Sequence, residues 1–242
     1  MAVNRLVLVI FCIALLYGCS REQKPAEPPA RRQEPTVILK PKPKMISPEQ
    51  RRELGFPEEI IRWVEDATGA VAEPFFEDVM MRTANLRGDV MMAGNKLRGF
   101  SVRTAKADEV IRDLSPVFRK QGFLVFRSEQ NYGKVPDIVT IVRGNNSYDI
   151  LKVQKTGSQN YHLESKAIIE WLKKQQQYGT FVITGAGADW VEAQFIKPPK
   201  NMKAFARSVA AFAPDVLADH KDSVDKLAEK MKRSNGFTLW WD

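Results

Sequence analysis

The chain has 242 residues, which is enough for one or two domains but not for three. Its hydrophobic residues (44%) and charged residues (27%) are close to the average of globular proteins. This composition excludes a wholly disordered chain, a collagen-like fibre and a polytopic membrane protein. The formal net charge is +8, and its meaning depends on where the basic residues lie.

The first eighteen residues have the pattern of a secretory signal peptide. Arg5 precedes an unbroken apolar run, residues 6–16, which as a helix would span about 16 Å, roughly half of a bilayer core. The run is therefore too short for a membrane-spanning helix and fits the apolar region of a signal. It ends in Leu16-Tyr17-Gly18-Cys19, which resembles a lipobox, the motif that directs lipid attachment to its cysteine. We expect residues 1–18 to be removed and Cys19 to be lipidated; the alternative is an N-terminal anchor that happens to contain a cysteine.

The cysteine content agrees with an exported lipoprotein. Cys12 and Cys19 are the only cysteines in the sequence, so the mature chain would have neither a free thiol nor a disulfide, which suits an oxidising compartment. In Gram-negative lipoproteins an Asp after the lipidated Cys favours retention in the inner membrane, and Ser20 holds that place here. We therefore expect a lipid-anchored protein of the bacterial cell envelope, on the outer membrane and facing the periplasm if the source is Gram-negative.

Residues 19–45 have the composition of a disordered tether. Six prolines between residues 20 and 45 oppose both helices and sheets, and such a segment reaches at most about 80 Å. Its seven basic and three acidic residues give a net charge of +4; they either favour anionic headgroups or merely keep the tether soluble. Residues 46–242 then have a net charge of only +3, too little for a nucleic-acid surface, so we expect no nucleic-acid partner.

The folded part begins with two short helices. Ser47-Pro48-Glu49-Gln50 is a capping box with proline in the first turn, and Gly55 ends this helix. A second helix is predicted from Pro57 to Gly69. Residues 70–96 contain apolar side chains interrupted by glycines, which indicates short strands or irregular packing. We therefore take 46–96 as an N-terminal helical and irregular segment.

From residue 97 helices and strands are intermixed. The patterns predict strands at 97–103, 123–126, 138–142, 148–153, 180–184, 190–195 and 237–241, and helices at 104–121, 164–178, 198–213 and 223–233. We expect the strands at 138–142 and 148–153 to form a hairpin, and Pro116 to kink or restart its helix. The predicted fold of residues 97–242 is α+β, with a mixed, mainly antiparallel sheet and packed helices.

Several motifs follow one another in the second half of the chain. They are Tyr148-Asp149-Ile150-Leu151, Asn160-Tyr161, Gly185-Ala186-Gly187, Asp189-Trp190-Val191-Glu192-Ala193, Pro198-Pro199, Pro214-Asp215 and Leu239-Trp240-Trp241-Asp242. In this order they resemble the bacterial family called domain of unknown function 4253, over about residues 97–242. Many members have a Cys before the Pro-Asp pair, where this chain has Ala213. The resemblance implies an α+β fold and brings no established activity.

The sequence offers little for metal, cofactor or nucleophilic chemistry. His162 and His220 are the only histidines, and neither has neighbours at the spacing of metal ligands, so we expect no metal and no Ser-His-Asp triad. Gly185-Ala186-Gly187 lacks the third glycine and the following helix of a phosphate loop, and is better explained as a tight turn. We therefore predict no cofactor and no catalytic residue.

Acidic and aromatic residues are the remaining candidates for a binding site. They are Asp149, Asp189, Trp190, Glu192, Asp215, Trp240, Trp241 and Asp242. On a strand, Asp189 and Glu192 point to opposite faces, so either would need another carboxylate about 5–9 Å away to hydrolyse a glycan; contacts that stabilise the fold are the other explanation. We expect Trp190 to be a core residue and Glu192 to bind a neighbouring backbone or basic group.

Two functions are compatible with these observations. The first is a lipid-anchored envelope protein with a non-catalytic domain that binds an envelope protein or polymer; an immunity-type role against a delivered toxin is one version. The second is a carboxylate-dependent hydrolase acting on glycan or peptidoglycan. A hydrolase needs two carboxylates that converge in a cleft, whereas a binding domain needs a flat or grooved apolar patch.

The lipid anchor can be tested at its one acceptor. Because Cys19 supplies the only thiol at the lipobox, Cys19→Ala is expected to accumulate as an unlipidated precursor. Labelling of cells with radioactive palmitate measures this, and Cys12→Ala is the matched control that retains the label. Equal labelling of Cys19→Ala and the natural chain would contradict the lipoprotein assignment.

Overall fold

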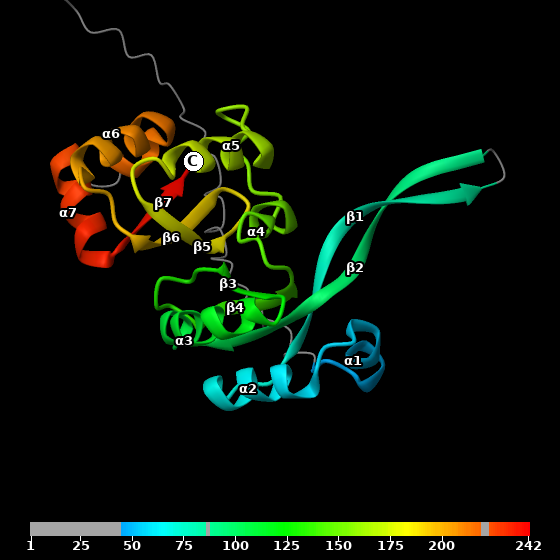
Figure 1. Ribbon diagram of the computed structural model, residues 1–242. Helices are drawn as coiled ribbons and strands as arrows, with labels where there is room; N and C mark the ends of the chain where they lie inside the picture. Colours follow the sequence, from blue (N-terminus) through cyan, green and yellow to red (C-terminus); the bar gives the residue numbers. More distant parts are fainter. Residues whose placement is uncertain (1–44, 86–87, 219–222) are drawn as a thin grey trace, which may run out of the picture. The chain divides into compact units, whose positions relative to one another are not determined.

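The computed structural model describes residues 45–85, 88–218 and 223–242 (Figure 1). The predicted signal peptide, Cys19, nearly all of the predicted tether and His220 lie outside these residues. Residues 42–242 form one compact unit.

The first two helices begin and end as the sequence predicts. α1 (Pro48–Leu54) has the complete capping box: Ser47 Oγ accepts from the Gln50 amide at 3.2 Å, and Gln50 Oε1 accepts from the Ser47 amide at 2.9 Å. It ends at Gly55, whose φ of 57° is left-handed. α2 (Glu58–Thr68) follows.

A long hairpin occupies most of residues 70–96, for which the sequence indicated short strands or irregular packing. β1 (Glu73–Asn85) and β2 (Gly88–Thr104) pair in antiparallel fashion along the whole of β1, from Glu73 opposite Ser101 to Asn85 opposite Gly88, with a register shift between Phe75 and Phe76. The glycine that was expected to interrupt the segment, Gly94, pairs within the ladder opposite Val79. β2 joins the rest of the sheet from Gly99 onward, so the far half of the hairpin projects as a two-stranded arm (Figure 1). β2 also runs without a break through residues 96 and 97, where the sequence suggested a boundary.

In the rest of the chain helices are interspersed with strands, and all strands belong to one seven-stranded sheet. These helices and strands are α3 (Ala107–Lys120), β3 (Phe123–Glu129), β4 (Asp137–Arg143), α4 (Asp149–Val153), α5 (Ser165–Gln175), β5 (Thr180–Ala186), β6 (Trp190–Lys197), α6 (Met202–Phe212), the 3₁₀ helix η1 (Pro214–Leu217), α7 (Val224–Ser234) and β7 (Gly236–Trp240). The strand order is β1-β2-β4-β3-β5-β6-β7. All neighbours are antiparallel except β3 and β5, which are parallel. The α+β fold with a mixed, mainly antiparallel sheet is confirmed.

The hairpin predicted for 138–142 and 148–153 is wrong. Residues 149–153 form helix α4, and β4 pairs with β2 and β3 instead. Asn146 directs this turn, because its side-chain oxygen accepts from the Tyr148 amide at 3.1 Å and its carbonyl from the Asp149 amide at 2.9 Å. α3 continues through Pro116, so of the two outcomes expected there, a kink or a restart, the restart does not occur.

Two hydrophobic clusters lie against the sheet. One joins β2, β3 and β4 to α1, α2 and α3, with Phe100 and Phe118 fully buried. The other joins β3–β7 to α4, α5, α6 and α7, with Phe126 and Phe205 fully buried. Since β3 contributes alternate side chains to both clusters, this strand is covered on both faces.

Because the hydrophobic clusters lie within the compact unit, we expect this unit to fold without residues 1–41. Every member of both clusters lies at or after Ile46, so a chain starting at Lys42 is expected to melt cooperatively at the temperature of the longer protein. A chain starting at Glu58 is the comparison: it lacks the buried Ile46, Leu54 and Phe56, and the loss of about 1.5–3 kcal/mol for each should lower its melting temperature strongly. Circular dichroism measures both, and a Lys42 chain without a cooperative transition would contradict the assigned boundary.

Candidate functional site

A groove of about 1510 Å³ opens beside α4 and α5. We call it the α4–α5 groove. Its walls come from α4 and α5, from the loop that joins them, from Ala188 and Asp189 before β6, and from the C-terminal residues Trp241 and Asp242. The chain thus builds it from three segments that are distant in sequence, all within the part that resembles the family.

Hydrogen bonds fix the loop between α4 and α5 to the turn between β5 and β6. Thr156 is fully buried; its hydroxyl donates to the Gly187 carbonyl at 2.8 Å, and the Gly157 amide donates to the Ala188 carbonyl at 2.7 Å. A Cβ at Gly157 would lie 2.7 Å from the Leu163 carbonyl oxygen, so only glycine fits there. The groove floor is therefore held by paired backbone groups.

Two non-glycine residues at the groove have left-handed backbones. Lys155 and His162 both have a φ of 51°, a conformation that is uncommon for residues with a Cβ and costs of order 1 kcal/mol or more. Lys155 takes it just after α4, where the Thr156 amide closes a turn on the Leu151 carbonyl at 2.9 Å. His162 takes it in the turn closed by Ser158 and Leu163. Both conformations shape the loop that forms the groove wall.

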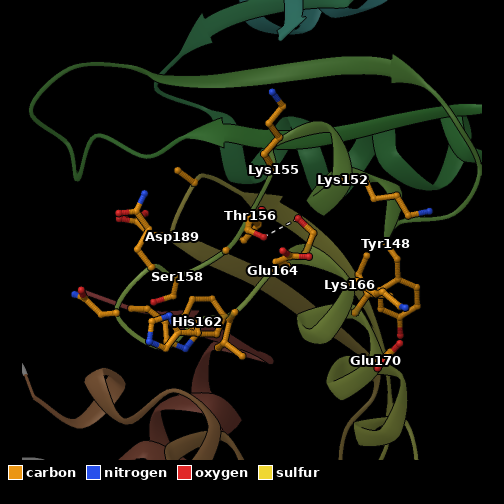
Figure 2. A pocket seen from close by; sticks show the side chains of 18 of the residues that line it. Tyr148, Lys152, Lys155, Thr156, Ser158, His162, Glu164, Lys166, Glu170 and Asp189 are labelled. Atoms are coloured by element: carbon orange, nitrogen blue, oxygen red, sulfur yellow. Dashed lines mark hydrogen bonds between the residues drawn. The ribbon is translucent and has the colours of Figure 1, made fainter. Parts of the chain in front are cut away.

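Charges of both signs line the groove. The basic residues are Lys152, Lys155, Lys166 and Lys173, and the acidic ones are Glu164, Glu170, Asp189 and Asp242. Figure 2 shows Asp189 on one side of the groove, with Lys152 and Lys166 on the other. A ligand that fills the groove therefore meets charges of both signs along α5, where Glu164 and Glu170 lie among the lysines, and further carboxylates at Asp189 and Asp242.

Three of the sequence candidates meet at this groove. Asp189, Trp241 and Asp242 all line it, and the Trp241 amide donates to the Asp189 carbonyl at 3.0 Å. The side chain of Trp241 is buried in the core, and its indole N–H donates to the Phe212 carbonyl at 3.4 Å. Trp241 is therefore a packing residue, whereas Asp189 and Asp242 are exposed.

Asp215 acts as a clamp on the C-terminus. One carboxylate oxygen accepts from the Asp242 amide and the other from the Tyr161 hydroxyl, each at 2.9 Å; this bond raises the pKa of Tyr161 above its ordinary value. Asn160 donates to the Asp242 carbonyl at 2.6 Å. Asp215 is thus a structural residue, as is Asp149, which starts α4 and pairs with Lys152 at 2.8 Å.

The other candidates, Trp190, Glu192 and Trp240, do not line the α4–α5 groove. Trp190 is half-buried and belongs to neither hydrophobic cluster, so the expectation that it is a core residue is wrong. Its indole lies over the β5–β6 turn, because a Cβ at Gly187 would fall 2.2 Å from the indole nitrogen. Trp240 is its cross-strand partner, also half-buried, and packs against the second cluster.

Glu192 belongs to a cluster of charges around Arg127, which we call the Arg127 cluster. The buried guanidinium of Arg127 bonds to Glu192 on β6 and Asp108 on α3, and its Nε lies 3.0 Å from Asp137 Oδ2 on β4, although this N–H makes no hydrogen bond. The expectation that Glu192 binds a basic group is confirmed. Sequence reasoning missed Arg127; the one signal was a cation directly after four apolar strand residues.

Burial and charge act against each other in the Arg127 cluster. Burial alone lowers the pKa of Arg127, but Glu192 and Asp108 raise it above its ordinary value, so the cation persists. Burial raises the pKa of Glu192 above its ordinary 4.5, and Arg127 offsets only part of this. Three carboxylates share one cation, so the cluster joins α3, β4 and β6 through β3.

Neither a metal centre nor a membrane span is found in the described part of the chain. No group of three or more His, Asp or Glu side chains could hold a metal ion there. No described helix is long and apolar enough to cross a bilayer.

The Arg127 cluster predicts a pH dependence of stability. The folded protein holds the Glu192 proton more tightly than the unfolded chain does. Protonation of Glu192 therefore contributes to the free energy of unfolding fully below about pH 4.5, and this contribution is lost as the pH rises through the folded-state pKa. In Glu192→Gln this decline is expected to be absent, as measured by urea unfolding at a series of pH values. Thr238→Val, at the cross-strand neighbour, is the control that keeps the decline; equal pH profiles for Glu192→Gln and the natural chain would refute the assignment.

Comparison with known proteins agrees with the resemblance over the C-terminal part of the chain. No curated protein and no solved structure matches the chain. Residues 138–242 match the family model described as domain of unknown function (DUF4253); the match begins later than residue 97, from which the resemblance was expected. These residues contain the whole α4–α5 groove, so the groove lies within the part of the chain that is similar to the DUF4253 family.

Proposed function

We propose that this protein is a lipid-anchored bacterial envelope protein whose DUF4253 domain binds a partner without catalysis, with the partner lying in the α4–α5 groove. The observation that carries the proposal is the groove itself, about 1510 Å³ and charged on both sides. Pockets for small molecules occupy about 300–1,000 Å³. The groove therefore suits a segment of a larger partner, a protein or an envelope polymer.

The distribution of charge narrows the ligand further. Lysines on α4 and α5 and carboxylates at Asp189 and Asp242 line the same groove, and Figure 2 shows Asp189 across from Lys152 and Lys166, so a segment with both acidic and basic groups gains ion pairs there. Such pairs at a surface contribute little affinity each but fix orientation and exclude wrong partners. A polypeptide segment or a peptide-bearing polymer has this chemistry, and a delivered toxin in an immunity-type role is one such partner.

The hydrolase is the second candidate, and one observation favours it. Asp189 and Asp242 line the same groove, as two carboxylates acting on a glycan would. The other acidic candidates are engaged elsewhere: Asp215 clamps the C-terminus, and Glu192 pairs with Arg127. Among the acidic residues singled out in the sequence, this leaves Asp189 and Asp242 as the pair for the alternative; Glu164, Glu170 and His162 line the groove as well.

Site-specific photocrosslinking in cells tests the binding proposal. A photoreactive amino acid at Lys166 in the groove is expected to give an adduct of higher mass, whereas the same amino acid at the exposed Lys120 on α3 is not. Asp189→Lys reverses one side of the groove and should reduce the Lys166 adduct at least tenfold, because a like charge at an ion-pairing position disfavours the partner. Equal adducts from both positions, or none from the groove, would sink the proposal.

Digestion of purified peptidoglycan distinguishes the two candidates. The natural chain is expected to release no soluble fragments, and Asp189→Asn and Asp242→Asn should behave like it. Release of fragments by the natural chain, lost in either variant, would establish the hydrolase in place of the binding domain.

A further inference from the structure

A second groove, of about 1210 Å³, lies between α6 and α7. We call it the α6–α7 groove. It is separate from the α4–α5 groove, since the two share no residue among those that line them. No function assigned above uses it.

The α6–α7 groove concentrates the positive charge of the folded part. Six basic side chains line it, Lys200, Lys203, Lys226, Lys230, Lys232 and Arg233, against Asp225 and Glu229. Its net charge is therefore +4, larger than the +3 of all residues from 46 to 242. The remainder of the folded part therefore has a slightly negative net charge, and the α6–α7 groove accounts for the positive net charge of residues 46–242.

The two acidic residues of the groove are already occupied. Asp225 pairs with Lys203 at 2.6 Å, and Glu229 pairs with Lys232 at 2.7 Å. Among the residues that the structure describes, no carboxylate pairs with Lys200, Lys230 or Arg233. These three cations lack an internal counter-charge and are available to an external anion.

The geometry of α7 directs its cations outward. Lys226, Lys230 and Arg233 follow one another at spacings of four and three residues, which places them along one stripe of the helix. All three are exposed, while Leu227 and Met231 are buried against the core. Helix α7 is thus amphipathic, with an apolar inner face and a cationic outer face.

We propose that the α6–α7 groove docks on the surface of an anionic phospholipid bilayer. All six basic residues are exposed, as suits a diffuse layer of headgroups rather than a single enclosed phosphate. Five of the six are lysines, whose flexible point charges do not require the fixed geometry of a bidentate arginine site. The proposal goes beyond the binding function, because it concerns a different surface and a different partner.

Vesicle co-sedimentation tests the docking on the chain from Lys42, which contains both hydrophobic clusters and lacks the lipid anchor and most of the basic tether. It is expected to bind vesicles of phosphatidylglycerol and phosphatidylcholine in equal parts and not vesicles of phosphatidylcholine alone. Each basic residue near an anionic surface contributes a factor of about five. The triple variant Lys200→Gln, Lys230→Gln, Arg233→Gln should therefore bind about 100-fold more weakly, and salt should weaken the natural chain.

A second triple variant is the matched control. Arg62→Gln, Lys120→Gln, Lys134→Gln removes the same charge from exposed positions on α2, on α3 and between β3 and β4, and is expected to keep most of the affinity, with both variants melting as the natural chain does. Equal losses in the two triple variants would show that only net charge matters and would overturn the assigned surface. Binding to single-stranded DNA but not to the anionic vesicles, or displacement from vesicles by inorganic phosphate at equal ionic strength, would overturn the bilayer as partner.

Discussion

The sheet depends on the contact between Arg127 of β3 and Gly185 of β5. β3 and β5 pair in the described sheet at this one position, which joins the half built on β1, β2, β4 and β3 to the half built on β5, β6 and β7. A Cβ at Gly185 would lie 3.1 Å from the Arg127 carbonyl oxygen and 3.0 Å from the Trp190 ring, so glycine allows the strands to approach. The Arg127 side chain then forms ion pairs with carboxylates from α3, β4 and β6. One residue thus supplies both the backbone bridge and the ionic connection between the halves.

This connection explains why the two groups of candidate residues have different roles. Glu192 and Trp190 lie at the junction, where the carboxylate is neutralised by Arg127 and the indole covers the β5–β6 turn. Asp189, the residue before Trp190, lies at the α4–α5 groove. In the segment 189–192, Asp189 is therefore a surface residue, Trp190 and Glu192 lie at the junction, and Val191 is fully buried in the core. Motifs such as Asn160-Tyr161, Pro214-Asp215 and the C-terminal Trp241-Asp242 converge in the same way on the clamp at the C-terminus, so much of the family resemblance reflects how the groove wall is held.

Local signals in the sequence were sufficient for the elements but not for their partners. The capping box at Ser47 and the apolar stripe of α7 depend on residues within one or two turns, and both appear in the structure where they were expected. The strand predicted at 148–153 was wrong because Ile150, Leu151 and Val153 suit a helical turn as well as a strand. The hydrogen bond to the side chain of Asn146 favours the helical turn. The strand predicted at 97–103 is part of β2, but the sequence did not indicate that β2 begins at Gly88, because Gly94, which suggested an interruption, lies within a paired ladder. Arg127 could not be assigned, because its partners are 10, 19 and 65 residues away and no local pattern identifies them.

The two proposed surfaces place different demands on affinity. A tether of about 26 residues would confine the folded part within roughly 80 Å of the bilayer, and at such short range effective concentrations reach the millimolar range. A few exposed lysines, each contributing about 1 kcal/mol near an anionic surface, are then enough to hold the α6–α7 groove against lipid for much of the time. Docking through one fixed face would limit the orientations of the α4–α5 groove, which a flexible tether alone leaves unrestricted. The folded part would then lose less orientational entropy when a partner binds the α4–α5 groove. The weak lipid contact would thus increase the affinity of the α4–α5 groove without contacting the partner.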